Sequence, residues 1–112
     1  MLPKVHRIVK EKDFKQVFRK GKYLSQDLLN LKYVKNNLDK SRFGFTIGLK
    51  ISKKAVIRNK IKRQMTEIIR HNLPSIKKGF DIVIMPKPAI VDQNYQEIKK
   101  ILVSLLKKTK IL

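Results

Sequence analysis

Residues 50–63 read KISKKAVIRNKIKR, and this stretch decides how the rest of the chain is interpreted. Seven of the fourteen residues are lysine or arginine, and none is acidic. From here onward, apolar residues fall on one side of a helical projection at about 100° per residue. They are Ile57, Ile61, Met65, Ile68 and Ile69, and the polar residues across from them are Arg58, Asn59, Lys62, Arg63, Thr66 and Arg70. We predict a helix that docks through its isoleucines, presents a basic face, and ends near Asn72, before Pro74.

Residues 11–20 carry a second helical pattern. Phe14, Val17 and Phe18 recur at i, i+3 and i+4, which gives one apolar stripe. Acidic residues stand in the first turn and basic residues in the last, the polarity that favours the helix dipole. We predict a short amphipathic helix that follows a basic arm and is capped by Gly21.

Residues 28–34 and 42–50 alternate between apolar and polar side chains, which is typical of half-exposed strands. A turn signal separates them at residues 36–39, so we expect an antiparallel pair. One face of the second strand carries Gly44 and Gly48. Strand glycines often mark a place where another part of the chain approaches closely.

Residues 80–85 form an apolar run between Gly79 and Pro86, which predicts a strand buried on both faces. A last helical pattern opens near Asp92, its expected N-cap, and runs to Leu106. The order is helix, two or more strands, helix, strand, helix. This order indicates an α+β sandwich with helices packed on one small sheet, and a strand–helix–strand crossover is right-handed by default.

The composition limits the class of protein. A chain of 112 residues is sufficient for one domain, and the absence of cysteine excludes thiol catalysis. Lysine and arginine number 28 against 8 acidic residues, so the net charge is +20, and a polyanionic partner would relieve the self-repulsion. We find no apolar run long enough to span a bilayer and no signal peptide, and we therefore expect a cytoplasmic protein without membrane contacts.

We predict no catalytic residues. His6 and His71 have no paired carboxylates at metal-ligand spacing, and we interpret both as surface residues. The eight acidic residues are scattered, whereas a two-metal nuclease needs a carboxylate cluster. If the protein takes part in cleaving a polyanion, the catalytic groups come from elsewhere.

Two groups of residues are candidates for nucleic-acid binding. In the basic helix only Glu67 offsets the cations, which favours phosphate binding over a merely solvated charged face. Asn59 fits either a contact to a base edge or sugar hydroxyl, or a local role at the start of the helix. Phe14 and Phe18 fit either the core or the floor of a groove where single-stranded bases stack, with Lys32 beside it.

Residues 53–63, KKAVIRNKIKR, resemble the RNR signature of the bacterial ribonuclease P protein family, in which Ala-Val-x-Arg-Asn-x-x-Lys-Arg follows a lysine-rich turn. Further matches are Arg7, residues 13–18 with Gly21, residues 41–45, and residues 78–84. This sequence departs from the pattern at Lys60, Thr66 and Lys32. The resemblance implies an α+β fold of order α-β-β-β-α-β-α whose β-α-β crossover is left-handed.

The resemblance also implies a function for one RNA-binding domain spanning residues 1–112. The residues expected to bind the catalytic RNA are Lys53, Lys54, Arg58, Asn59, Lys60, Lys62, Arg63 and Arg70. Those expected to line a cleft for the 5′ leader of precursor tRNA are Arg7, Phe14, Phe18 and Lys32. Hydrolysis would be performed by the RNA with Mg²⁺, with one protein per RNA, and the sequence leaves open whether the protein itself holds metal ions.

Three other classes of protein share part of these features. A basic ribosomal RNA-binding protein of similar fold is the main alternative. A DNA-binding module would need a helix-turn-helix, whereas here a strand follows the basic helix. A membrane-surface peptide would leave its apolar residues exposed, whereas here they are spread over several elements as in a core.

Overall fold

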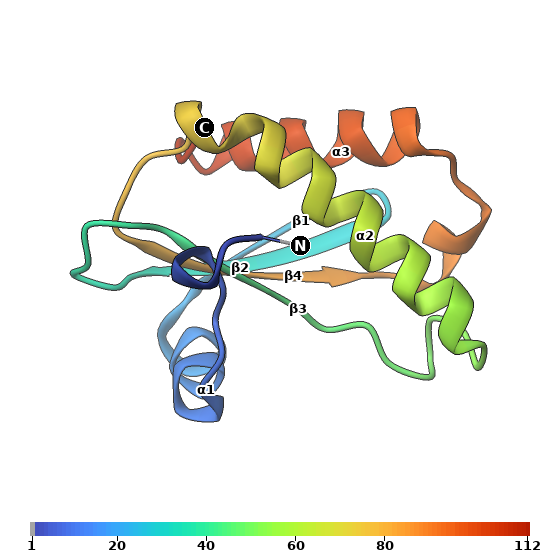
Figure 1. Cartoon of the computed structure of the whole chain (residues 1–112), viewed down its shortest axis with the longest axis horizontal. Helices are drawn as coiled ribbons and strands as arrows, with labels where there is room; N and C mark the ends of the chain where they lie inside the picture. Colours follow the sequence, from blue (N-terminus) through green and yellow to red (C-terminus); the bar gives the residue numbers. More distant parts are fainter. Residues whose placement is uncertain (1) are drawn as a thin grey trace.

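The computed structural model describes residues 2–112 as one α+β unit (Figure 1). The main elements are α1 (Glu11–Lys20), β1 (Lys22–Gln26), β2 (Leu29–Lys35), β3 (Arg42–Phe45), α2 (Ala55–Asn72), β4 (Phe80–Pro86) and α3 (Tyr95–Lys108). Three short 3₁₀ helices, η1 (Lys4–His6), η2 (Leu73–Ser75) and η3 (Pro88–Asp92), connect them. The predicted α+β class and the implied order α-β-β-β-α-β-α are confirmed.

The four strands form one mixed sheet in the order β1-β2-β4-β3. β2 is antiparallel to both β1 and β4, whereas β3 is parallel to β4. The predicted antiparallel pairing of β2 with β3 is therefore wrong. Because β4 is apolar on both faces, it lies inside the sheet, between β2 and β3. The loop of residues 36–41 connects β2 to β3 across the position of β4.

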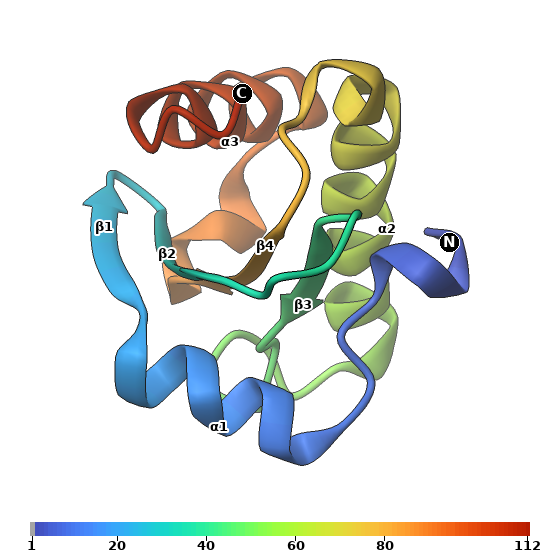
Figure 2. The same cartoon turned by 90° about the vertical axis from the view of Figure 1, so that its left-hand side faces the viewer.

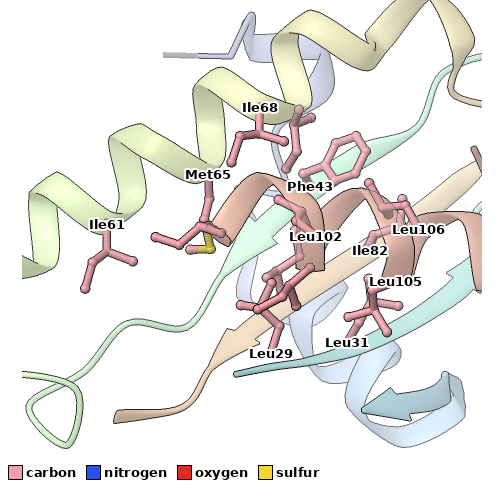
Figure 3. Close-up of a cluster of buried hydrophobic side chains, with 14 of the residues drawn as sticks. Leu29, Leu31, Phe43, Ile61, Met65, Ile68, Ile82, Leu102, Leu105 and Leu106 are labelled. Carbon is pink, nitrogen blue, oxygen red and sulfur yellow. The ribbon is translucent and has the colours of Figure 1, made fainter. Parts of the chain in front are cut away.

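The helices lie on opposite faces of the sheet. Figure 1 shows α2 and α3 above it and α1 below. The main core lies between the sheet and the upper pair of helices (Figure 3). Its fully buried members include Leu29, Leu31, Phe43, Met65, Ile68, Ile82, Leu102 and Leu105. A smaller cluster of Ile8, Val17 and Val83 holds α1 and the N-terminal arm against the lower face.

The crossover from β3 through α2 to β4 is left-handed, as the family resemblance implies, and the default right-handed expectation is wrong (Figures 1 and 2). The reason lies in the two faces of the sheet. With the same strand order, a right-handed connection would pack the isoleucines of α2 on the face of Lys32, Gly44 and Asp81. The left-handed connection places them on the apolar face formed by residues such as Leu31 and Ile82.

Two boundaries differ from the sequence prediction. β3 ends at Phe45 instead of continuing to Lys50, and the side chain of Leu49 is 69% exposed. The N-cap of α3 is Asn94, whose side-chain oxygen accepts a hydrogen bond from the Glu97 backbone N–H at 2.9 Å, while Asp92 belongs to η3.

Two further features were not foreseen from the residue patterns. β1 is an edge strand with polar residues on both faces, so its sequence lacks the alternation of a half-buried strand. Thr66 is buried, although the helical projection placed it on the polar side of α2. It lies beside Leu2 and Arg7, because the N-terminal arm covers this part of the helix.

Candidate nucleic-acid interface

The start of α2 is a cationic helix end with an ordered turn before it. No acidic residue stands in the first turn of the helix, so the partial positive charge of its N-terminus is not offset there. Ser52 stabilises the turn through two hydrogen bonds. Its hydroxyl oxygen accepts one from the Lys54 backbone N–H at 3.1 Å, and its carbonyl oxygen accepts one from Arg58 Nη1 at 2.8 Å. Arg58 is therefore half-buried and holds the turn as well as contributing charge.

The predicted basic residues extend along the exposed side of this helix end. The exposed ones are Lys53, Lys54, Lys60, Lys62 and Arg63, and the neutral side chain of Asn59 is exposed among them. Exposed cations without neighbouring carboxylates attract phosphates at low energetic cost, because no internal ion pair has to break first. The structure thus brings most of the residues expected to bind the catalytic RNA onto one surface, which we call the basic face of α2.

Arg70 lies apart from this face. It is twelve residues beyond Arg58, about 18 Å along a helix axis. Its Nη2 pairs with Glu67 Oε2 at 2.6 Å, and this hydrogen bond lowers the pKa of the Glu67 carboxyl below its ordinary value. His71 also approaches Glu67, at 3.0 Å. A phosphate bound by Arg70 would have to compete with Glu67.

The two phenylalanines of α1 face the lower side of the sheet in different settings. Phe14 is half-buried and packs directly over Gly44, where a Cβ would come within 2.5 Å of its ring. The glycine face of β3 thus admits an aromatic side chain from α1. Phe18 is 38% exposed, and Lys32 Nζ lies 5.7 Å from its ring centroid while donating to its carbonyl oxygen at 2.8 Å.

Three of the predicted site residues lie together at the outer edge of β3, whereas Phe18 and Lys32 lie elsewhere along α1 and β2. The backbone N–H of Ile8 donates to the Phe43 carbonyl at 2.9 Å, and this bond ties the N-terminal arm to the strand. Beside it lies a pocket of about 120 Å³ whose walls include Arg7, Phe14 and Lys62. Arg7 and Phe14 were assigned to the leader cleft and Lys62 to the catalytic RNA, so the pocket joins the two surfaces.

Arg42 is a positioning residue that the sequence patterns do not reveal. Its guanidinium donates to both carboxylate oxygens of Asp81, at 2.9 and 2.7 Å, and lies 3.4 Å from Asp13 of α1. Asn36 donates to Asp81 at 2.8 Å. The hydrogen bonds to Asp81 raise the pKa of Arg42 above its ordinary value. This network fixes α1 relative to β3 and β4, and the signal for it was an aspartate inside an otherwise apolar strand, which needs a buried partner.

Gly44→Ala should disturb the aromatic surface without removing an aromatic side chain. The new methyl group meets the Phe14 ring at 2.5 Å, so the ring has to move. We expect a loss of about 1 kcal/mol in the free energy of unfolding and weaker binding of single-stranded RNA. Urea unfolding and RNA titration would measure both. Gly48→Ala is the control for stability, because its Cβ would meet nothing within 4 Å, and equal stability of the two variants would contradict the packing described.

Among residues 2–112, no cluster of three or more His, Cys, Asp or Glu side chains is arranged to hold a metal ion. Within the same part of the chain, no helix is long and apolar enough to cross a membrane.

The model of the Ribonuclease P family matches residues 2–110. The chain belongs to this family. A "Ribonuclease P protein component" from Alkaliphilus oremlandii is 34% identical over 108 residues, which are 96% of this chain and 94% of that protein. One from Synechocystis is 42% identical over 96 residues, covering 85% of this chain and 77% of the relative.

Solved structures of ribonuclease P proteins have the same fold. A mutant of the Staphylococcus aureus protein with defective mRNA degradation activity superposes with a TM-score of 0.91 at 29% identity, covering 97% of this chain and 92% of that one. The Thermotoga maritima protein gives a TM-score of 0.83 at 35% identity, with coverages of 91% and 96%. The prediction of a ribonuclease P protein subunit, partnered with ribonuclease P RNA, is confirmed.

Proposed function

We propose that this ribonuclease P protein binds the catalytic RNA on the basic face of α2 and the 5′ leader of precursor tRNA along the cleft between α1 and the sheet. The observation that carries the proposal is the pocket at the edge of β3. Arg7, Phe14 and Lys62 all line this pocket, which supports a single RNA-binding domain, residues 1–112, with two adjoining RNA-binding surfaces. Two RNA segments can therefore be held at a fixed relative position.

The two surfaces suit different parts of an RNA. The basic face of α2 combines exposed cations with a helix N-terminus, which favours phosphates whatever the sequence. Beside α1, the partly exposed ring of Phe18 lies next to the ammonium group of Lys32, a pair that favours the stacked bases and phosphates of a single strand. An unpaired leader presents both kinds of group.

The protein acts by positioning and charge neutralisation. Hydrolysis belongs to the RNA subunit, where bound Mg²⁺ would activate the attacking water and stabilise the leaving oxygen. A protein of net charge +20 between two RNA segments lowers their mutual repulsion, so less Mg²⁺ should be needed for assembly. We further propose one protein per catalytic RNA and a cytoplasmic location.

Phe18→Ala should weaken binding of precursor tRNA to the holoenzyme by about tenfold and leave mature tRNA binding unchanged. A stacked base contributes on the order of 1–3 kcal/mol, and part of that remains with Phe14. Equilibrium binding of both tRNAs would measure the effect. Val91→Ala is the matched control, because it also truncates an apolar side chain of similar exposure, 39% against 38% for Phe18, but in η3. An equal loss for precursor and mature tRNA would remove Phe18 from the leader site.

The proposed function is tested by release of the 5′ leader from precursor tRNA at low Mg²⁺, using ribonuclease P RNA of the same source with and without this protein. We expect strong stimulation by the protein. Absence of stimulation, with the RNA active at high Mg²⁺, would contradict the proposal. Stable binding to ribosomal RNA without any effect on leader release would instead favour the ribosomal alternative.

A further inference from the structure

The segment leading into α2 exposes apolar side chains to an unusual degree. Val56 is 77% exposed and Leu49 is 69% exposed, the two highest values among the large apolar side chains of residues 2–112. Val56 stands in the first turn of α2, and Leu49 stands in the loop between β3 and α2. The isoleucines of the same helix are largely buried in the core, whereas the side chains of Val56 and Leu49 stay exposed to solvent.

A hollow adjoins this segment. It has a volume of about 590 Å³ and is formed by residues 46–51 together with Pro86. The loop that forms most of it lies at the right-hand end of the molecule in Figure 1, below the start of α2. Leu49, Ile47 and Ile51 supply apolar walls, and Lys50 is the one charged residue lining it. At Gly48 a Cβ would meet nothing within 4 Å, so the hollow is open there.

The charge around this hollow restricts its partner. From residue 40 to residue 66 the chain has no acidic side chain, and Lys50, Lys53 and Lys54 lie in the loop and turn between Leu49 and Val56. A partner that covers the patch must therefore offer negative charge next to apolar surface. An unpaired nucleotide does so, because its base has two apolar faces and its phosphate is anionic. The patch is also continuous in sequence with the basic face of α2.

We propose that Leu49 and Val56 contact unpaired nucleobases of the catalytic RNA, while the neighbouring lysines hold the adjoining phosphates. This inference rests on the proposed function, since it extends the catalytic-RNA surface from α2 to the preceding loop. It adds an apolar component to an interface otherwise described by charge. The protein would thereby select an unpaired RNA segment over a regular duplex, whose base faces are stacked.

The test compares Leu49→Ser with Leu38→Ser for binding to ribonuclease P RNA in the absence of tRNA. Both leucines are exposed loop residues, and Leu38 lies in the loop between β2 and β3. We expect Leu49→Ser to weaken binding by about five- to tenfold and Leu38→Ser to leave it unchanged. Leu49→Phe should retain or tighten binding, because an aromatic ring stacks on any base.

Salt dependence separates this contact from a phosphate contact. Lys53→Ala should reduce the slope of log K against log salt by about 0.7–0.9, whereas Leu49→Ser should lower K at every salt concentration without changing the slope. Equal affinities of Leu49→Ser and wild type would overturn the inference. So would a defect confined to precursor tRNA binding, which would assign the patch to the leader. If wild-type protein fails to bind ribonuclease P RNA at all, the proposed function itself is wrong.

Discussion

Replacing Lys60, Lys62 and Arg63 together by alanine should lower the affinity for ribonuclease P RNA by about 100-fold at moderate salt, and should reduce the slope of log K against log salt by about 2–3. All three side chains are exposed on the basic face of α2 and make no ion pair with any residue of the described chain. Their loss removes phosphate contacts without leaving a buried charge, so the fold should persist. Equilibrium binding across a range of salt concentrations measures both quantities.

The matched control removes the same charge elsewhere. Lys99, Lys100 and Lys107 are exposed on the outer side of α3, so Lys99→Ala/Lys100→Ala/Lys107→Ala also lowers the net charge by three. We expect this variant to lose less than about threefold in affinity, through the weaker overall field alone. Equal losses from the two triple variants would show that net charge, and not the basic face of α2, determines binding.

The second large effect is on stability. Arg42→Met should reduce the free energy of unfolding by about 3 kcal/mol, since it leaves the Asp81 carboxylate buried without its guanidinium partner. The Asp81 side chain is 7% exposed, and Asn36 alone cannot compensate a buried charge. Urea unfolding monitored by circular dichroism measures the change.

A second variant distinguishes this explanation from a simple packing defect. Arg42→Met/Asp81→Asn removes the uncompensated charge as well, and we expect it to be more stable than Arg42→Met alone. Arg42 also contacts Asp13 of α1, so the single variant should weaken leader binding more than binding of the catalytic RNA. If Arg42→Met has the same urea midpoint of unfolding as the wild-type protein, the stabilising role of the Arg42–Asp81 network is contradicted.

Local patterns in the sequence predicted the helices well and the strand pairing poorly. The stripe of Phe14, Val17 and Phe18 predicted α1, and the isoleucine pattern together with Pro74 predicted α2 and its end near Asn72. Such patterns arise from burial of one helix face and need no knowledge of distant residues. Strand order depends on long-range pairing, so the insertion of β4 between β2 and β3 had no local signal.

The candidate site was predictable where it depends on charge and less so where it depends on packing. Exposed lysines and arginines of α2 could be assigned from their position on a helical projection. The projection could not distinguish the half-buried Arg58 and the ion-paired Arg70 from these exposed cations. Their contacts with Ser52 and Glu67 depend on side-chain positions that only the folded structure shows. Arg42 was missed because its two carboxylate partners are far apart in the sequence and meet only in the fold.

The central claim is that one domain holds the catalytic RNA and the leader at the same time, and a series of leader lengths tests it most directly. Affinities of precursor tRNAs with leaders of zero to about ten nucleotides would be measured for the RNA alone and for the holoenzyme. We expect the protein to leave leaderless tRNA binding nearly unchanged and to tighten binding progressively as the leader fills the α1 cleft. An equal gain at every leader length, including zero, would contradict the account.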